Sequence, residues 1–327
     1  MKKVLIFLVL LVPSIISTIL AVFFPIVIDP NVLNIIRFLG QIFFFIAWAY
    51  LFWNLGAFFQ AIWGQIETEF PDLLTENIKL YIDELGFDVH GKLLSRNQFN
   101  ENTPLVFLLT GGGGKHMNLY GMGSLLVKFG VKAFLFDHPG KVGKSHGTTP
   151  ESKIRSPTRS ILTLKKMIDY AISREDIKTD KIGLFGGSLG AFTVVYGGFT
   201  DERIKLIIGQ AVGLIENKEE MEKIKKKIPW WFKKFCQFIK LDIDDLANLN
   251  YHQFNDPKYK RLRSRVYLLQ TKDDTAVHYE SFLKLKEALD LPDENCLVFE
   301  KGGHGFLHHQ GTILGWTMGK IKKHLLN

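Results

Sequence analysis

A serine flanked by glycines lies in the pentapeptide Gly-Gly-Ser-Leu-Gly at 186–190. A strand-like run at 181–185 precedes it, and a helix-like segment at 191–196 follows it. A serine on a sharp turn between a strand and a helix has a strained backbone, and only small flanking residues avoid a clash there. The turn lifts the hydroxyl clear of the sheet, next to a helix N-terminus that favours developing negative charge. The pattern predicts that Ser188 is a nucleophile.

A serine nucleophile needs a general base, and the base needs a carboxylate to orient it. Two later apolar runs, 266–270 and 296–299, each end a few residues before such a group, Asp274 after the first and His304 after the second. The order is therefore serine, aspartate, histidine, with gaps of 86 and 30 residues. This order, with each group just after a strand, predicts a catalytic triad of Ser188, Asp274 and His304.

Neighbouring residues compete for two of these roles. Asp273 directly precedes Asp274 and is the alternative acid. His308 and His309 lie close to His304, but we expect both on the following helix as ordinary polar residues. His304 is preferred because the glycines around it can form a loop that places an imidazole over the serine.

A tetrahedral intermediate also needs donors for its oxyanion. The backbone N–H of Leu189, directly after the nucleophile, is one candidate. The second is expected in the glycine loop 111–114, which follows the apolar run 105–109, because glycine lets the backbone approach closely. Gly112 is the preferred donor and Gly113 the next. The same glycines match neither the P-loop spacing nor a dinucleotide fingerprint, so no nucleotide, other cofactor or metal is expected.

The residues from 76 onward alternate between short apolar runs and helical patterns such as 158–173 and 279–289. Near-continuous apolar strands separated by helices predict a mostly parallel sheet covered on both faces, which is a three-layer α/β domain. The first two strands are expected to form an antiparallel pair. The expected strands are 77–82, 87–94, 105–109, 131–136, 181–185, 204–208, 266–270 and 296–299.

The segment between 208 and 266 is longer than an ordinary connection, and it predicts a helical cap at about 214–260. Its apolar residues recur at spacings of three and four, which favours two amphipathic helices broken at Pro229. Eight lysines between Lys218 and Lys240 share this segment. The apolar stripe either packs on the core with the lysines solvated or forms an interfacial surface. Its members are Ile224, Ile228, Trp231, Phe232, Phe235, Phe238 and Ile239.

The N-terminal region carries two uncharged apolar runs, 25 residues between Lys3 and Asp29 and 29 residues between Arg37 and Glu67. Because about 20 apolar residues span a bilayer, residues 1–66 are expected to form a membrane anchor of two transmembrane helices, about 4–28 and 38–63. The alternative for the first run is a cleaved signal peptide, but the run is longer than a usual signal core and has no convincing cleavage site.

The positive charges at the chain start favour an N-terminus on the cytoplasmic side. Two crossings then return the domain at 67–327 to that side, so we expect a multi-pass membrane protein with its α/β domain facing the cytoplasm. A net charge of +8 agrees with a membrane partner, and no nucleic-acid-binding motif is present. Cys236 and Cys296 match no zinc or redox spacing. Nothing in the sequence indicates an oligomeric state.

Together these motifs resemble the α/β-hydrolase superfamily, in its branch of serine esterases, lipases and related peptidases. The resemblance rests on the pentapeptide 186–190, the glycine loop 111–114, the turn Asp137-His-Pro-Gly with Gly143 and Ser145, the pair 273–274, and Gly-His-Gly-Phe at 303–306. It spans residues 76–327 apart from the cap. It implies an eight-stranded sheet that opens with a hairpin, and a structural role for the segment 137–145.

The resemblance also carries the triad onto Ser188, Asp274 and His304, and the spacing to Val277 favours Asp274 over Asp273. Thr110 departs from many members, which have histidine there. The implied function is a membrane-anchored serine hydrolase that cleaves carboxyl esters through an acyl-enzyme, with an acyl lipid or other hydrophobic ester as substrate. The alternatives are a serine peptidase or acyltransferase on the same triad, or a catalytically silent membrane-bound scaffold.

Overall fold

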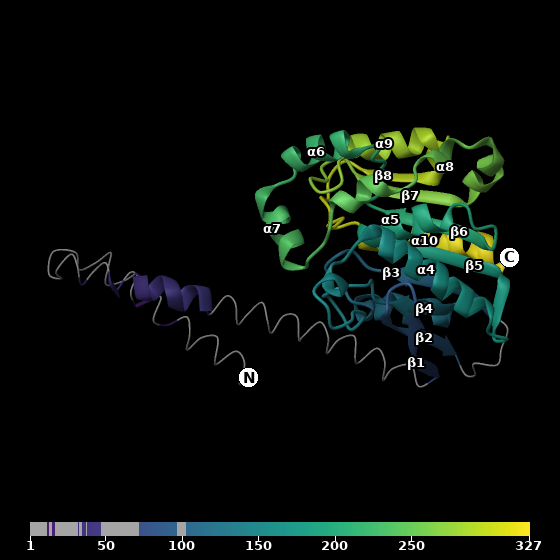
Figure 1. The fold of residues 1–327 in the computed structure, drawn as a ribbon, viewed down its shortest axis with the longest axis horizontal. Helices are drawn as coiled ribbons and strands as arrows, with labels where there is room; N and C mark the ends of the chain where they lie inside the picture. Colours follow the sequence, from purple (N-terminus) through teal and green to yellow (C-terminus); the bar gives the residue numbers. More distant parts are fainter. Residues whose placement is uncertain are drawn as a thin grey trace. The chain divides into compact units, whose positions relative to one another are not determined.

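The computed structural model describes residues 12, 15, 16, 32, 35, 36, 38–46, 72–96 and 103–327. The chain divides into two compact units, Met1–Pro71 and Asp72–Asn327. The second unit contains every residue of the expected triad and the whole expected cap, so it is the part that positions the candidate site (Figure 1).

Most of the two expected membrane spans, 4–28 and 38–63, lies outside the described residues. Residues 38–46 are helical, and Phe38 and Phe45 are among their exposed side chains. Within the part of the chain that the structure describes, no helix combines the length and the apolar character needed to cross a bilayer. The transmembrane hairpin therefore stays a prediction.

The second unit is built on one eight-stranded sheet with the strand order β1-β2-β4-β3-β5-β6-β7-β8. β2 pairs antiparallel with both β1 and β4, and the remaining neighbours pair parallel. The predicted hairpin and mostly parallel sheet are confirmed. The strands are β1 Leu73–Ile82, β2 Phe87–Arg96, β3 Thr103–Leu109, β4 Lys132–Phe136, β5 Ile177–Gly187, β6 Ile204–Gln210, β7 Val266–Thr271 and β8 Cys296–Phe299.

Helices cover both faces of the sheet, which makes the three layers. Along β3, Leu105 and Phe107 belong to one buried cluster and Val106 and Leu108 to the other, because successive side chains point to opposite faces. The first cluster includes side chains of α4, α5 and α9, and the second includes side chains of α3 and α10. These helices are α3 Tyr120–Lys128, α4 Pro157–Ile172, α5 Leu189–Gly198, α9 Tyr279–Ala288 and α10 Gln310–Ile321.

The cap lies between β6 and β7 and begins with two helices, as expected. α6 (Lys218–Lys227) starts at Asn217, whose side-chain oxygen accepts the N–H of Glu220 at 2.9 Å. Pro229 separates α6 from α7 (Trp230–Phe238) and is the residue directly before α7. Short elements complete the cap: η3 Asp244–Asn248, α8 His252–Asn255 and η4 Pro257–Arg265.

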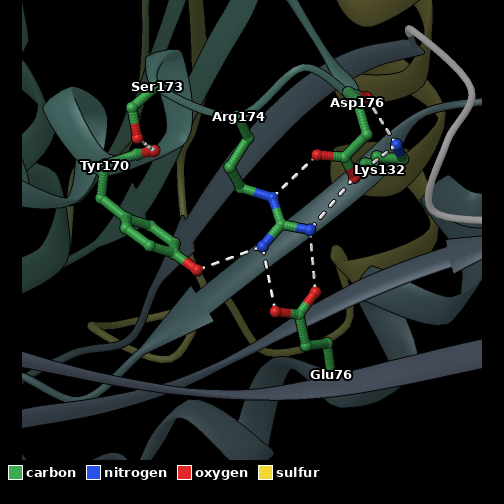
Figure 2. Close-up of polar contacts among 6 residues, drawn as sticks. All are labelled: Glu76, Lys132, Tyr170, Ser173, Arg174 and Asp176. Carbon is green, nitrogen blue, oxygen red and sulfur yellow. Dashed lines mark hydrogen bonds and ion pairs between the residues drawn. The ribbon is translucent and has the colours of Figure 1, made fainter.

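A partly buried ion-pair network connects β1 with β4 and with the loop before β5 (Figure 2). Arg174 donates to both carboxylate oxygens of Glu76, at 3.0 and 2.8 Å, and to Asp176 at 2.8 Å. Asp176 also accepts from the buried Lys132 at 2.9 Å. Burial alone would raise the pKa of Asp176, but the hydrogen bonds from Arg174 and Lys132 hold it below its ordinary value. Because these groups come from β1, β4 and the loop before β5, the network fixes where the strands start.

We expect Asp176→Asn to lower the free energy of unfolding by about 3 kcal/mol, since it leaves the buried Lys132 ammonium without this carboxylate. Chemical denaturation of the full chain in mild detergent measures the loss. Because the pKa of Asp176 is lower in the folded protein than its ordinary value of 3.8, its ionised form stabilises the fold at pH values above 3.8. This stabilisation is lost as the pH falls through the pKa that Asp176 has in the folded protein. The variant should therefore lose less stability in acid than the wild type.

The control is Glu300→Gln, which breaks the exposed Lys272–Glu300 pair. Exposed pairs contribute under about 1 kcal/mol, so this variant should unfold almost like the wild type. Equal effects of the two substitutions would contradict the assigned role of the ion-pair network.

Candidate active site

Ser188 lies at the turn between β5 and α5 with φ 52° and ψ −117°. A Cβ at Gly186 would lie 2.2 Å from the carbonyl oxygen of Gly190, and one at Gly190 would lie 2.4 Å from that of Leu109. Both contacts are too close for any side chain, so the turn needs these two glycines. The N–H of Ser188 donates to the carbonyl of Gln210 at 2.8 Å, which fixes the turn to the end of β6.

The structure brings the three predicted triad residues together. His304 Nε2 lies 3.0 Å from Ser188 Oγ, and His304 Nδ1 lies 2.8 Å from a carboxylate oxygen of Asp274. The other oxygen of Asp274 accepts the N–H groups of Ala276 and Val277 at 2.8 and 2.9 Å. Because a carboxylate only accepts hydrogen bonds, Nδ1 carries the proton and Nε2 is free to accept the serine proton. The arrangement can deprotonate Ser188 as it attacks a carbonyl carbon.

The two adjacent aspartates have different environments. The Asp274 side chain is fully buried against His304, whereas Asp273 is exposed and accepts the N–H groups of Gly303 and Gly302 at 2.7 and 3.2 Å. These bonds, the one from Gly303 first, lower the pKa of Asp273. Asp273 therefore anchors the loop that carries His304 and does not contact the imidazole.

The rival histidines lie apart from the serine, but the expectation that they lie on the following helix is wrong. α10 begins only at Gln310. The Nε2–H of His309 donates to the carbonyl of Lys301 at 2.8 Å, and its ring stacks on Phe299. The loop turns sharply just before the helix, where His308 has a positive φ of 69°.

The glycine loop at 111–114 runs beside Ser188. A Cβ at Gly111 would lie 3.4 Å from that of Ser188, and one at Gly112 would lie 3.9 Å from that of Leu189. Leu189 is the first residue of α5, so the helix does not use its N–H. The two predicted oxyanion donors, Gly112 and Leu189, thus lie in adjacent segments next to Ser188.

A buried arginine holds this loop in place. The Arg155 guanidinium donates to the carbonyl oxygens of Gly112 and Gly114, the latter at 3.2 Å. Its second nitrogen donates to the carbonyls of His138, at 3.3 Å, and Val142. Burial lowers the pKa of Arg155 to about 10, which leaves the side chain charged at neutral pH.

The backbone of Arg155 also connects the loop to the cap. Its N–H donates to the carbonyl of Lys240 and its carbonyl accepts the N–H of Asp242, both at 2.8 Å. The segment that follows α7 is therefore paired with the same residue that holds the glycine loop. One arginine links the end of the cap helix with the backbone expected to bind an oxyanion.

The segment 137–145 holds both ends of the glycine loop through hydrogen bonds. Asp137 accepts from both the N–H and the Nδ1 of His116, each at 2.8 Å. Burial and the charge of Arg155 lower the pKa of His138 to about 3, so this ring is neutral and its Nε2–H donates to the carbonyl of Thr110 at 2.8 Å. Thr110, which departs from the common histidine, is thereby held through its backbone.

A small, mostly apolar pocket with a volume of about 60 Å³ opens at Ser188 beneath the cap. The polar side chains in its wall are Ser188, His278 and Ser281, and the remaining lining is apolar. That lining comes from the start of α4, from α5, from the cap and the segment that leads into it, and from the loop after β7. Its members are Pro157, Leu189, Phe192, Ile215, Met221, Ile224, Ile228, Phe232, Leu241, Ile243, Leu246, Ala276 and Val277.

Arg155 and His278 were not among the site residues predicted from the sequence, and Phe232 was predicted only as a member of the apolar stripe of the cap. Phe232 lies edge-on to the His304 ring, with centroids 5.9 Å apart. Arg155 lies in a polar stretch of the sequence, close to Lys153 and Arg159, so residue type did not distinguish it from these exposed or half-exposed cations.

Comparisons with known proteins agree with this architecture. Residues 104–242 match the family model described as alpha/beta hydrolase fold. The structure is similar to a cold-adapted esterase from an Arctic intertidal metagenomic library, with TM-score 0.53 and 19% identity, covering 78% of this chain and 95% of that one. No curated protein sequence matches the chain. The chain is an α/β-hydrolase by fold, as its motifs predicted.

Two further solved structures share the fold. The 2,6-dihydroxy-pseudo-oxynicotine hydrolase has TM-score 0.55 and 19% identity, covering 77% of this chain and 68% of its own. An esterase of Pyrococcus furiosus has TM-score 0.52 and 15% identity, covering 77% of this chain and 94% of its own. At these identities the likeness concerns the fold and not the substrate.

We expect Arg155→Lys to slow the reaction of Ser188 with a fluorophosphonate by roughly 10²-fold, the effect of losing one oxyanion donor. Lysine keeps the charge, but its single ammonium cannot replace the planar fork that reaches several carbonyls. The rate constant of covalent labelling measures the effect, and thermal unfolding shows whether the variant is folded.

Arg159→Lys is the matched control, because Arg159 also binds backbone carbonyls, those of Glu151 and Ile154, away from the glycine loop. It should label at the wild-type rate. A folded Arg155→Lys that labels as fast as this control would contradict the role assigned to Arg155.

Proposed function

We propose that this protein is a membrane-anchored serine hydrolase that cleaves carboxyl esters with apolar acyl groups. The observation that carries the proposal is the hydrogen-bonded series Ser188–His304–Asp274 at the mouth of an apolar pocket. A series of this kind supports nucleophilic acyl transfer.

In the proposed reaction Ser188 Oγ attacks the ester carbonyl carbon while His304 Nε2 accepts its proton. The oxyanion is stabilised by the N–H groups of Leu189 and of the glycine loop. Collapse breaks the bond to the alcohol oxygen, which takes the proton from His304, and leaves an acyl group on Ser188. Water then attacks this acyl-enzyme with His304 as base, which releases the carboxylic acid and restores the serine.

The composition of the pocket favours an ester of an apolar acid. Acyl chains bury well against the wall of leucine, isoleucine and phenylalanine. A peptidase that recognises a free amino terminus needs a carboxylate near its site, and no Asp or Glu lines this pocket among the described residues. Acyl transfer to an alcohol other than water remains the second candidate, because it uses the same acyl-enzyme.

The membrane part of the proposal rests on the two uncharged runs of 25 and 29 residues at the N-terminus. The exposed aromatic side chains at Phe38 and Phe45 in the helical stretch 38–46 support it. With the N-terminal lysines on the cytoplasmic side, two crossings place the hydrolase unit at the cytoplasmic face.

We expect a fluorophosphonate probe to label the wild-type protein and not Ser188→Ala. The same pair of proteins is then assayed on p-nitrophenyl esters, monoacylglycerols, lysophospholipids and aminoacyl amides. The esters should be cleaved by the wild type alone, with preference for apolar acyl chains. Preference for amides would contradict the ester proposal, and the absence of labelling in folded protein would favour a silent scaffold.

Substitutions of the two aspartates should separate their roles. Asp274→Asn should lower kcat by about 10⁴-fold, because an amide no longer fixes the histidine in the tautomer that accepts the serine proton. Asp273→Asn keeps the triad and weakens only the anchor of the His304 loop, so its loss should be far smaller. Steady-state ester hydrolysis measures both, and a larger loss for Asp273→Asn would reverse the assignment.

A further inference from the structure

The cap helix α7 exposes a row of aromatic side chains that do not line the pocket, although the ring of Phe235 also packs against Gly113 of the glycine loop. Trp230 is 76% and Phe238 is 71% exposed, and Trp231 and Phe235 are also exposed. Positions 230, 234 and 238 follow each other at spacings of four, and positions 231, 235 and 238 at spacings of four and three, so the five positions share one face of the helix. The opposite side of α7 is buried through Cys236 and, in Phe232, packs on His304.

Lysines outnumber acidic residues around this face, and the nearest carboxylates, Glu222, Asp242 and Asp244, flank the lysine-rich segment. Seven lysines and no acidic residue occur in the segment 223–240. In the part of the chain that the structure describes, Lys225 is the one of these lysines with carboxylate partners, Glu222 and Asp244. Lys141 adds a further cation, since its ammonium lies 4.8 Å from the centre of the Phe238 ring.

We propose that the exposed face of α7, formed by Trp230, Trp231, Lys234, Phe235 and Phe238, binds the surface of an anionic lipid bilayer. Tryptophan and phenylalanine bury favourably at the boundary between headgroups and acyl chains, and unpaired lysines are attracted to anionic lipids. A folded monomer rarely leaves four large aromatic side chains adjacent and exposed, and an acidic protein partner would match the lysines but not the aromatic row. α7 lies at the periphery of the hydrolase unit (Figure 1).

This docking is a second membrane contact, separate from the N-terminal runs and independent of whether Ser188 is catalytic. It places α6 and α7, whose other sides line the pocket through Ile224, Ile228 and Phe232, next to the lipid. An ester substrate that leaves the bilayer would then meet the apolar wall of the pocket without crossing bulk water.

The test uses the full chain with its two native cysteines replaced by alanine and one new cysteine labelled with an environment-sensitive nitrobenzoxadiazole dye. The labelled sites are Trp230→Cys and Phe238→Cys. The control position is Lys205→Cys, which is exposed near the start of β6. The candidate active site lies at the opposite end of this strand, where the carbonyl of Gln210 accepts the N–H of Ser188. The proteins are reconstituted into vesicles of phosphatidylcholine alone or mixed with phosphatidylserine.

In the mixed vesicles we expect the dye at 230 and 238 to shift to shorter wavelength and to be quenched by lipids brominated near the headgroup. The dye at 205 should stay unquenched. The shift should weaken in pure phosphatidylcholine, at high salt, and when Lys226, Lys227, Lys233 and Lys234 are changed to glutamine.

Adding Ser188→Ala should leave these signals unchanged, so failure of the hydrolase proposal and failure of docking are distinguishable. The proposal would be overturned if the dye at 230 and 238 showed the same emission wavelength and the same lack of quenching as the dye at 205 in both kinds of vesicle. So would a blue shift that depends on protein concentration without lipid, since it would assign the face to self-association.

Discussion

The backbone of Ser188 has a conformation that a residue with a side chain avoids, at a cost of about 1–3 kcal/mol. It persists because the surroundings leave no alternative. Gly186 and Gly190 let the two arms of the turn and the end of β3 approach within contact distance, and the bond to Gln210 fixes the N–H of the serine. The rest of the site depends on this turn, because it sets where the hydroxyl points and therefore where His304 and the glycine loop must lie.

The loops that carry His304 and the glycines beside Ser188 are held mainly by hydrogen bonds between side chains and backbone groups. Asp273 holds the loop of His304 by two N–H groups, while Asp274 orients the ring itself. Arg155 places one fully buried charge among carbonyl oxygens of the glycine loop and also pairs with the chain leaving α7. Arg155 therefore connects the residues that follow α7 in the cap with the glycine loop beside Ser188. A change in this part of the cap is expected to alter the position of that loop.

The sheet and its hairpin could be predicted because the strands are short apolar runs separated by helical patterns. The order of Ser188, Asp274 and His304 could be predicted because each of them follows the end of such a run. Asp273 and Asp274 could not be separated by residue type, since only the direction of each side chain at the strand end distinguishes them. Arg155 was missed because its partners are carbonyl groups, which leave no sequence signature. The spacing pattern of the cap treated Phe232 and Phe238 alike, although Phe232 is half-buried with its ring edge-on to His304 and Phe238 is exposed.

If Ser188 is acylated during turnover, intact-protein mass spectrometry should detect the acyl group. The full chain is mixed with a p-nitrophenyl ester of an apolar acid and quenched with acid during steady-state hydrolysis. We expect a mass gain equal to one acyl group, located by peptide mapping on Ser188 and absent from Ser188→Ala. Hydrolysis without any adduct, or an adduct that persists in Ser188→Ala, would contradict acylation of this serine.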